Sequence, residues 1–383
     1  TRNGEIARWA MARGLRMEAP GADLADRLPE ADWLLSIANL DLIPEDVLAR
    51  AARGAVNFHD GPLPAYAGLN APVWALLAGE PRHGVTWHLI APGVDSGDIL
   101  VQRRFDVAPG DTALTMNAKC YEAAIESFGD LVAALETGAP ERRAQDPAAR
   151  SYFGLDLRPP AAARLDFSRP AAEIARLVRA LDHGDYANPL AAPKIASESG
   201  VWLVLRAEET GGSAAPGTVL ACDDGGLVVA AKEGAIRISG FRSPDGTVAD
   251  PAEVARAGEV LPILPEEDAR ALTDRIARVS RLEPHLRRRL RALDPGALPL
   301  GPGGGEVAER RLDLPEGLAP DRLAALCAAW AARSMGRSAC DLAWRDAESA
   351  ALAWPGHVSD WVPVRFDATP ETRRTLLFSA TLP

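Results

Sequence analysis

Short apolar runs alternate with helical patterns through the first 150 residues, and this alternation constrains the fold more than any other feature of the chain. The apolar runs indicate strands over residues 33–37, 55–58, 85–90 and 99–105. Pro44 to Gly54 carries the start and stop signals of a helix, and Asp111 to Gly138 carries apolar side chains at helical spacing. Strands that alternate with helices predict an α/β fold.

After residue 150 the pattern becomes that of a small antiparallel structure. A short amphipathic helix is predicted over residues 171–181. Apolar runs then follow at close spacing, over residues 201–205, 218–221, 227–231 and 235–239. Short strands separated by turns rich in Gly and Asp predict a small β-barrel.

The last third of the chain has a mixed character. From about residue 266 it is helical and rich in arginine. A stretch rich in Gly and Pro predicts a linker over residues 298–307, and a further helix is predicted over 318–335. We therefore divide the chain into three parts, residues 1–150, 151–262 and 263–383.

Charge and cysteine usage narrow the classes of function. A formal net charge of −11 disfavours nucleic acid as the main partner. The four cysteines form no C-x-x-C pair, which argues against a structural zinc site or a disulfide framework and favours a reducing cytoplasm. None of the lysines follows a glycine, so there is no G-K-[ST] phosphate loop. No apolar run approaches the roughly 20 residues that span a bilayer, so we expect no membrane partner.

Polar side chains gather where the second predicted strand ends. Asn57 and His59 are two residues apart, so both side chains lie on one side of that strand. A loop stiffened by proline and glycine follows. The carboxyl ends of strands carry ligands in open α/β sheets, so we expect the functional site there. Asp95, in the loop after the third predicted strand, is the candidate carboxylate, and Asp98 is its rival.

This set of side chains suits transfer of an acyl group. Asn, His and Asp without a Ser or Cys nucleophile favour direct transfer over a covalent acyl-enzyme. The histidine can hold or move a proton, the carboxylate can orient it, and the amide can donate to a developing oxyanion. Transfer to an amine fits, although not uniquely. We interpret His83 and His88 as structural, and we expect no metal because no His/Cys ligand set is clustered.

Four motifs of the first part have a combined spacing that is highly specific. They are Asn57-x-His59, Leu63-Pro64-x-Tyr66-x-Gly68, Gly84-Val85-Thr86 and Asp95-x-Gly97. Together they resemble the 10-formyltetrahydrofolate-dependent formyltransferase family. The resemblance implies that Asn57, His59 and Asp95 are catalytic and that 10-formyltetrahydrofolate is the co-substrate. It also implies folate contacts in the segment after the first predicted strand, at Ala38, Asn39, Leu40, Ile43 and Pro44.

The resemblance extends over residues 1–262 and carries an expectation about the fold. It implies a Rossmann-like doubly wound sheet followed by an OB-like β-barrel, with Arg164–Phe167 and Pro216–Leu220 similar to parts of that barrel. The family's first strand and helix would precede Thr1. We therefore expect the chain to be a fragment that lacks its N-terminal strand.

The acceptor of the formyl group is a separate question. Residues 197–262 carry 5 Lys and Arg against 10 Asp and Glu, which is too acidic a surface for tRNA. Segments of residues 263–383 weakly resemble part of a condensation domain of a non-ribosomal peptide synthetase, and a linker or docking segment is the other interpretation. Formyltransferase domains open some such synthetases, so we expect a carrier-bound amino acid as acceptor and neighbouring synthetase domains as partners. The alternatives are methionyl-tRNA, a nucleotide sugar, water in a formyltetrahydrofolate hydrolase, and an inactive interaction module.

Overall fold

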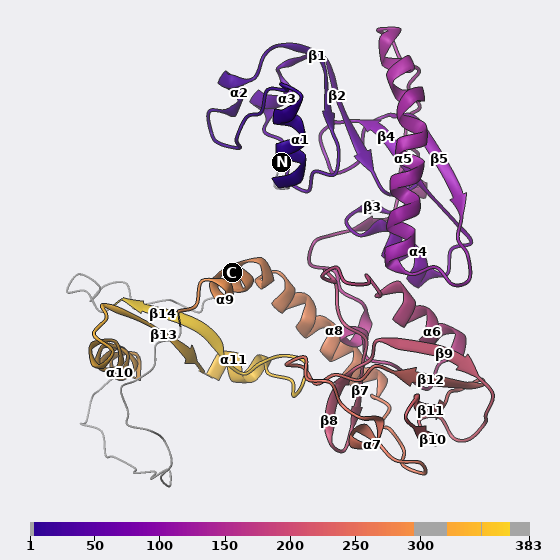
Figure 1. Cartoon of the computed structure of the whole chain (residues 1–383), viewed down its shortest axis with the longest axis vertical. Helices are drawn as coiled ribbons and strands as arrows, with labels where there is room; N and C mark the ends of the chain where they lie inside the picture. The colour runs from indigo at the N-terminus through magenta and orange to yellow at the C-terminus, as the bar shows by residue number, and fades with distance from the viewer. Residues whose placement is uncertain (1–3, 295–319, 346, 368–383) are drawn as a thin grey trace. The chain divides into compact units, whose positions relative to one another are not determined.

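The computed structural model describes residues 4–294, 320–345 and 347–367 (Figure 1). The chain divides into two compact units, and each is described by itself. The first unit contains residues 1–157 and 163–263, and the second contains residues 158–162 and 264–383. The predicted linker over residues 298–307 lies outside the described residues. In the part of the chain that the structure describes, no helix has the length and apolar character needed to cross a bilayer.

A four-stranded sheet in the order β1-β2-β4-β5 forms the centre of the first 150 residues. Its strands are β1 (Ala31–Ser36), β2 (Ala51–His59), β4 (Arg82–Leu89) and β5 (Ile99–Asp106). Only β1 and β2 are parallel, while β2 pairs antiparallel with β4 and β4 with β5. The loop between β4 and β5 is too short for the crossover that a parallel pair needs. The mixed α/β character is confirmed, but the described sheet is mixed instead of doubly wound.

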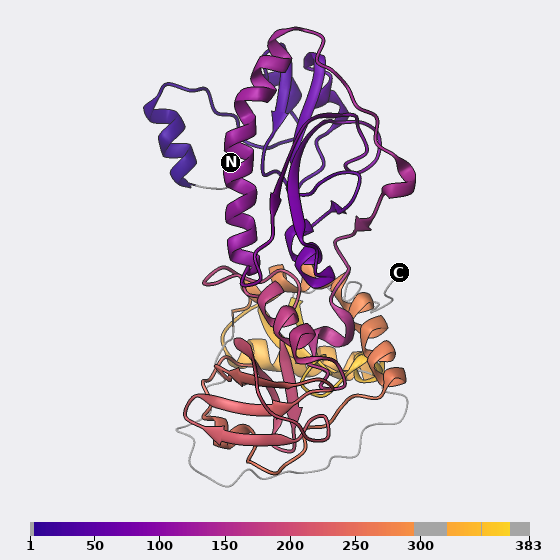
Figure 2. The same cartoon turned by 90° about the vertical axis from the view of Figure 1, so that its right-hand side faces the viewer.

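The predicted long helix is α5 (Ala113–Glu136), which lies along one face of this sheet (Figure 2). Its buried side chains, among them Leu131, pack with Val85 and Trp87 of β4 in one apolar core. This core holds the central strands in place and so fixes where their carboxyl ends lie. The helix is capped by the side chain of Thr112 and not by that of Asp111.

The predicted helix after Pro44 is much shorter than expected. The structure has only α3 (Glu45–Leu48) here, and β2 begins three residues later. Gly54, which the sequence indicated as a helix stop, instead lies opposite Trp33 of β1 in the parallel pair. Pairing with the neighbouring strand has overridden the local helix signals. The remaining short elements of this region are α1 (Gly4–Ala12), α2 (Leu24–Arg27), β3 (Ala67–Gly68), α4 (Ala71–Ala78) and β6 (Tyr152–Phe153).

The second half of the first unit is built around an antiparallel sheet in the order β10-β11-β12-β9. The elements are α6 (Ala171–Ala180), β7 (Lys194–Ser197), β8 (Gly200–Leu203), β9 (Arg206–Thr210), β10 (Val219–Asp223), β11 (Gly226–Ala230), β12 (Ala235–Ser239) and α7 (Pro251–Val254). Helix α6 packs on β9 and β12, while β7 and β8 form a separate pair. Among the described residues these strands do not close into a barrel, so the predicted OB-like barrel is not confirmed.

The second unit combines helices with one strand pair. Its elements are α8 (Glu266–Ser280), α9 (Glu283–Arg291), α10 (Pro320–Ser334), β13 (Ala339–Trp344), α11 (Ala347–Leu352) and β14 (Val362–Asp367). Strands β13 and β14 are antiparallel, and α10 packs on them through a small core that includes Ala332, Cys340 and Phe366. The helix predicted over residues 318–335 is thus present, whereas the strand pair was not predicted.

Candidate active site

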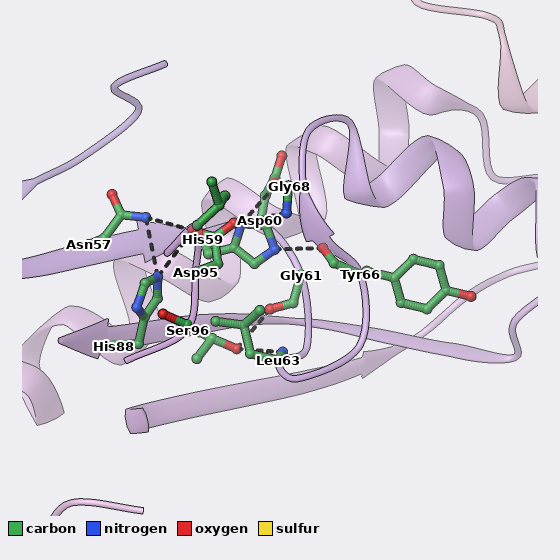
Figure 3. A network of polar contacts seen from close by, with 12 residues as sticks. Asn57, His59, Asp60, Gly61, Leu63, Tyr66, Gly68, His88, Asp95 and Ser96 are labelled. Carbon is green, nitrogen blue, oxygen red and sulfur yellow. Dashed lines mark hydrogen bonds and ion pairs between the residues drawn. The ribbon is translucent and has the colours of Figure 1, made fainter. Parts of the chain in front are cut away.

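Strand β2 places Asn57 and His59 together at its carboxyl end. In the sheet, Asn57 lies opposite Ser36 of β1 and His88 of β4, and His59 lies opposite Thr86. Because β2 has a strand on each side, its end is enclosed, and the His59 side chain is only 5% exposed. Figure 3 shows Asn57, His59 and Asp95 turned toward one another.

His59 makes one hydrogen bond and has longer contacts with the carboxylates of Asp95 and Asp60. Its Nε2 lies 2.7 Å from the carbonyl oxygen of Tyr66, and its Nδ1 lies 3.5 Å from Asp95 Oδ2. A carbonyl oxygen can only accept, so Nε2 carries a hydrogen and donates it. The other ring nitrogen therefore faces the carboxylate, which orients the ring from the opposite side.

Asp95 joins the polar groups of the site. Its Oδ2 accepts from the backbone N–H of Gly68 at 2.8 Å, and its Oδ1 lies 3.5 Å from Asn57 Nδ2 and 3.4 Å from His88 Nε2. Burial would raise the pKa of Asp95, but the contact with His88, the charge of His59 and the Gly68 N–H together lower it to about 2. The side chain is therefore a carboxylate throughout the physiological pH range.

The loop that carries Asp95 is fixed by residues that follow α5. The side-chain amide of Gln145 donates to the backbone oxygens of Asp95 at 2.8 Å and of Gly97 at 2.7 Å. Arg150 donates to the carbonyl of Val94 at 2.7 Å. These three bonds set the position of the Asp95 backbone, which has a φ of 47° in the left-handed region.

The loop between β2 and α4 is tied down by Thr86. Its hydroxyl donates to the carbonyl of Gly61 at 2.7 Å and accepts from the N–H of Leu63 at 3.1 Å. Gln102 of β5 also donates to the Leu63 carbonyl, at 2.8 Å. A Cβ at Gly61 would lie 2.6 Å from His59 Nε2, so the loop can pass this close to the ring only without a side chain there.

His88 belongs to the site, contrary to its interpretation as structural. Its Nε2 lies 3.3 Å from Asn57 Nδ2 as well as near Asp95, and its Nδ1 donates to the carbonyl of Leu89 at 2.8 Å. A prediction of His88 as a site residue would have required the register of β2 and β4, which sets His88 opposite Asn57. The buried His83, in contrast, contacts the backbone oxygen of Asp60 through its Nε2 at 2.9 Å, and burial lowers its pKa to about 4.

The rival carboxylate does not enter the site. No contact of the Asp98 side chain with Asn57 or His59 occurs among the described residues, while its backbone oxygen accepts from the N–H of Leu89 at 2.9 Å. The structure therefore brings Asp95, and not Asp98, to His59.

The segment expected to contact folate follows β1 at the same edge of the sheet, because β1 and β2 are parallel. Its side chains are open to solvent, with Leu40 80% and Leu42 87% exposed. Asn39 binds only the backbone of Asp41 in the contacts that the structure gives. Across the described residues, no group of three His, Cys, Asp or Glu side chains is arranged to hold a metal ion.

Several solved structures are similar to this chain. HypX from Aquifex aeolicus in complex with tetrahydrofolic acid is 20% identical, with a TM-score of 0.46 over 58% of this chain and 38% of that one. WlaRD, a sugar 3N-formyl transferase determined with dTDP and 5-N-formyl-THF, is 18% identical, with a TM-score of 0.49 over 61% of this chain and 80% of that one. An N-formyltransferase from Helicobacter canadensis in complex with folinic acid and dTDP-3-aminofucose is 18% identical, with a TM-score of 0.48 over 61% of this chain and 82% of that one. The chain thus spans well under half the length of HypX.

Two family models match most of the first unit. Residues 21–131, which contain Asn57, His59 and Asp95, match the model described as formyl transferase. Residues 159–258 match the model of the formyl transferase C-terminal domain. The two matches cover more than half of the chain in the order expected for one protein, and with them the prediction of formyltransferase domains is confirmed: the chain belongs to the formyl transferase family.

Proposed function

We propose that the protein transfers a formyl group from 10-formyltetrahydrofolate to a primary amine. The observation that carries the proposal is the convergence of Asn57, His59 and Asp95 within the matched formyl transferase segment. Attack by an amine on a formyl carbon needs a donor for the developing oxyanion and a group that accepts a proton. The amide, the imidazole and the buried carboxylate can supply these roles.

Each side chain has a part in this reaction. The amine nitrogen forms a bond to the formyl carbon, and the carbonyl oxygen gains negative charge. Asn57 Nδ2 can donate to that oxygen, since its contacts with His88 and Asp95 are long, at 3.3 and 3.5 Å. His59, positioned by Asp95 and Tyr66, lies beside Asn57 and can stabilise the same charge or move a proton.

Proton balance assigns a role to Asp95. The attacking amine becomes more acidic once the new bond forms, and Asp95 is ionised, so its carboxylate can take that proton, directly or through water. The bond from the formyl carbon to N10 of the folate then breaks, and N10 takes up a proton as tetrahydrofolate leaves.

The expected acceptor is an amino acid carried on a synthetase thiol arm. The support is electrostatic: residues 197–262 have twice as many acidic as basic residues, and affinity for an RNA partner needs basic contacts to phosphates. The partners of the chain would then be a carrier protein and neighbouring synthetase domains.

The test uses the full chain with 10-formyltetrahydrofolate and four acceptors in parallel. These are an aminoacyl-carrier protein, initiator aminoacyl-tRNA, a nucleotide-linked amino sugar and water alone. Formylation of the carrier-bound amine, detected by mass spectrometry, is the expected result. Formylation of only the tRNA or the sugar would overturn the choice of acceptor, and consumption of the donor without any acceptor would favour the hydrolase. Lack of any donor consumption would overturn the proposed activity itself. Asn57→Ala is the inactive control, and Asp98→Asn is the matched control whose activity should persist.

A further inference from the structure

A cavity of about 210 Å³ lies where α4, the segment after β5 and α6 meet in the first unit. Helices α4 and α6 pack against each other there (Figure 1). None of the catalytic candidates lines this cavity. Its polar walls come from three places: Glu80 after α4, Asp111 before α5, and Arg176 and Arg179 on α6.

The two arginines bring positive charge that the fold does not use. Arg176 and Arg179 are three residues apart on α6, so both side chains leave the helix on the same face. Both residues are half-buried. Across the residues that the structure describes, neither guanidinium forms a hydrogen bond or an ion pair, and Arg179 Nε is buried without an acceptor. A buried charged donor without a partner costs free energy, so this arrangement calls for a ligand.

The carboxylates of the cavity have other partners. Asp111 accepts from Lys119 Nζ at 2.5 Å, and also from a backbone N–H and a hydroxyl. Glu80 accepts from the hydroxyl of Tyr66 at 2.8 Å. Neither carboxylate forms an ion pair with the two arginines in the part of the chain that the structure describes. Lys119 balances Asp111, so two guanidinium groups remain against one carboxylate.

The position of Arg176 is fixed by the end of α4. Gly79 follows this helix with a φ of 74°, and a Cβ there would lie only 3.0 Å from Arg176 Nη1. The carbonyl groups at the end of a helix favour a cation nearby, which accounts for the place of Arg176. They do not account for Arg179, which lies one turn further along α6. The pair therefore needs a second explanation.

We propose that this cavity binds a phosphate group. An arginine presents a planar fork of donors that matches the oxygens of a carboxylate or a phosphate. The two oxygens of a carboxylate satisfy one such fork, whereas a phosphate has enough oxygens for two. A cavity of about 210 Å³ is smaller than the roughly 300 Å³ of sites that enclose a drug-sized ligand. It therefore suits a phosphate group better than a whole nucleotide or folate.

The phosphate can come from two sources. Tyr66 contacts both places, because its carbonyl accepts from His59 at 2.7 Å and its hydroxyl donates to Glu80 at 2.8 Å. The cavity is thus linked to the candidate active site through one residue. A phosphopantetheine thiol arm that delivers the amine would bring a phosphate with it, and this source rests on the proposed function. Free inorganic phosphate is the other source.

The experiment measures binding to the full chain by calorimetry, with ³¹P NMR as a second readout. The probes are inorganic phosphate, phosphopantetheine and, as a carboxylate, acetate. Arg176→Gln and Arg179→Gln should each raise the Kd for both phosphorylated probes about tenfold, the effect of one lost charged hydrogen bond. Arg206→Gln removes the same charge from an exposed position on β9 and should leave the Kd within about twofold.

A variant that changes no charge keeps the test independent of the arginines. Ala108 lines the cavity and is exposed, so Ala108→Leu should narrow the cavity and weaken binding without disturbing the fold. Phosphate binding that is unchanged in Arg179→Gln and Ala108→Leu would overturn the inference. So would acetate that binds as tightly as phosphate. Loss of folate binding instead of phosphate binding would assign the arginines to the glutamate carboxylates of the folate, and would also overturn it.

The two proposals fail in different ways, because the titration requires no turnover. A protein that binds phosphate through Arg179 but formylates no amine would refute the proposed function and support the phosphate site. Formyl transfer without any phosphate binding would do the reverse. Phosphopantetheine that binds more tightly than phosphate would place the acceptor's arm in the cavity, and equal binding would identify free phosphate as the ligand. Circular dichroism of each variant excludes a change of fold as the cause.

Discussion

Two segments that follow neighbouring parallel strands differ sharply in how firmly they are held. The end of β2 and the loop after β4 form a closed network in which the side chain of His59 is 5% exposed and that of Asp95 is 10% exposed. The residues after β1 leave Leu40 and Leu42 more than three-quarters exposed. Preorganised donors and charges lower a barrier without having to move, whereas an exposed apolar segment offers surface to be buried by a ligand. The chemistry and the binding of the donor should therefore respond to different substitutions.

The largest effect should come from the carboxylate of the closed network. Asp95→Asn keeps the shape of the side chain but removes the acceptor for the amine proton, so kcat should fall on the order of 10²–10⁴. Affinity for the folate should stay near that of the unmodified protein. Stopped-flow turnover together with calorimetric titration of the folate measures both, and a parent-like kcat would contradict the assignment.

Removal of the amide donor should have an effect nearly as large. Asn57→Ala should reduce kcat on the order of 10²–10³, the usual cost of one oxyanion donor. Asn39→Ala, in the exposed segment, is the matched comparison and should leave kcat within a few-fold. If the two variants lost turnover equally, the separation of chemistry from binding would be wrong.

Substitution of Thr86, which holds the loop between β2 and α4, should affect mainly the stability of the fold. Thr86→Val keeps the side-chain volume but removes the hydroxyl that bonds the Gly61 carbonyl, the Leu63 N–H and the Gln102 amide. The bond from the Leu63 N–H to the Gly61 carbonyl at 3.1 Å remains, so the loss should cost roughly 1–3 kcal/mol in the free energy of unfolding. Thr218→Val removes a more exposed hydroxyl that donates to Ala215, and should cost less. Urea unfolding of both variants tests this difference.

Acid should weaken the closed network through Asp95. Its pKa of about 2 lies below the ordinary value of 3.8, so it stabilises the fold above pH 3.8, and this contribution is lost as the pH falls through 2. The shift corresponds to about 2 kcal/mol. The difference in unfolding free energy between the unmodified protein and Asp95→Asn should therefore shrink over this interval. A difference that stays constant would show that the carboxylate contributes no linked proton.

The smallest effect should come from the exposed segment. Leu40→Ala and Leu42→Ala should leave unfolding within about 0.5 kcal/mol of the unmodified protein, because neither side chain is buried in the fold. If the segment covers the folate, KM for the donor should rise about tenfold, the equivalent of one lost apolar contact. Unchanged KM in both variants would remove this segment from the folate site.

The sequence predicts which polar side chains of β2 lie together better than it predicts the residues around them. Asn57 and His59 are two residues apart on a strand, so period-two geometry alone places them together. His88 was missed because it reaches Asn57 through the antiparallel register of β2 and β4, which depends on a pairing that no local pattern encodes. The helix expected up to Gly54 failed for the same reason, since strand pairing outweighs local propensity there. The strands β7, β9, β13 and β14 were missed because their short runs mix polar and apolar residues.

The bonds from Gln145 and Arg150 to the Asp95 loop have a consequence for cutting and grafting this chain. The four-stranded sheet and α5 are complete by Gly138, so a truncation would naturally be placed at the end of this helix. A fragment ending there would lose both clamps on the loop, as well as Tyr152 and Phe153 of β6, which pair with Ala67 and Gly68. Gly68 supplies the N–H that holds Asp95, so such a fragment could fold and still present a misplaced carboxylate. A domain exchange that moves the sheet and α5 into another protein should therefore place its junction after residue 153.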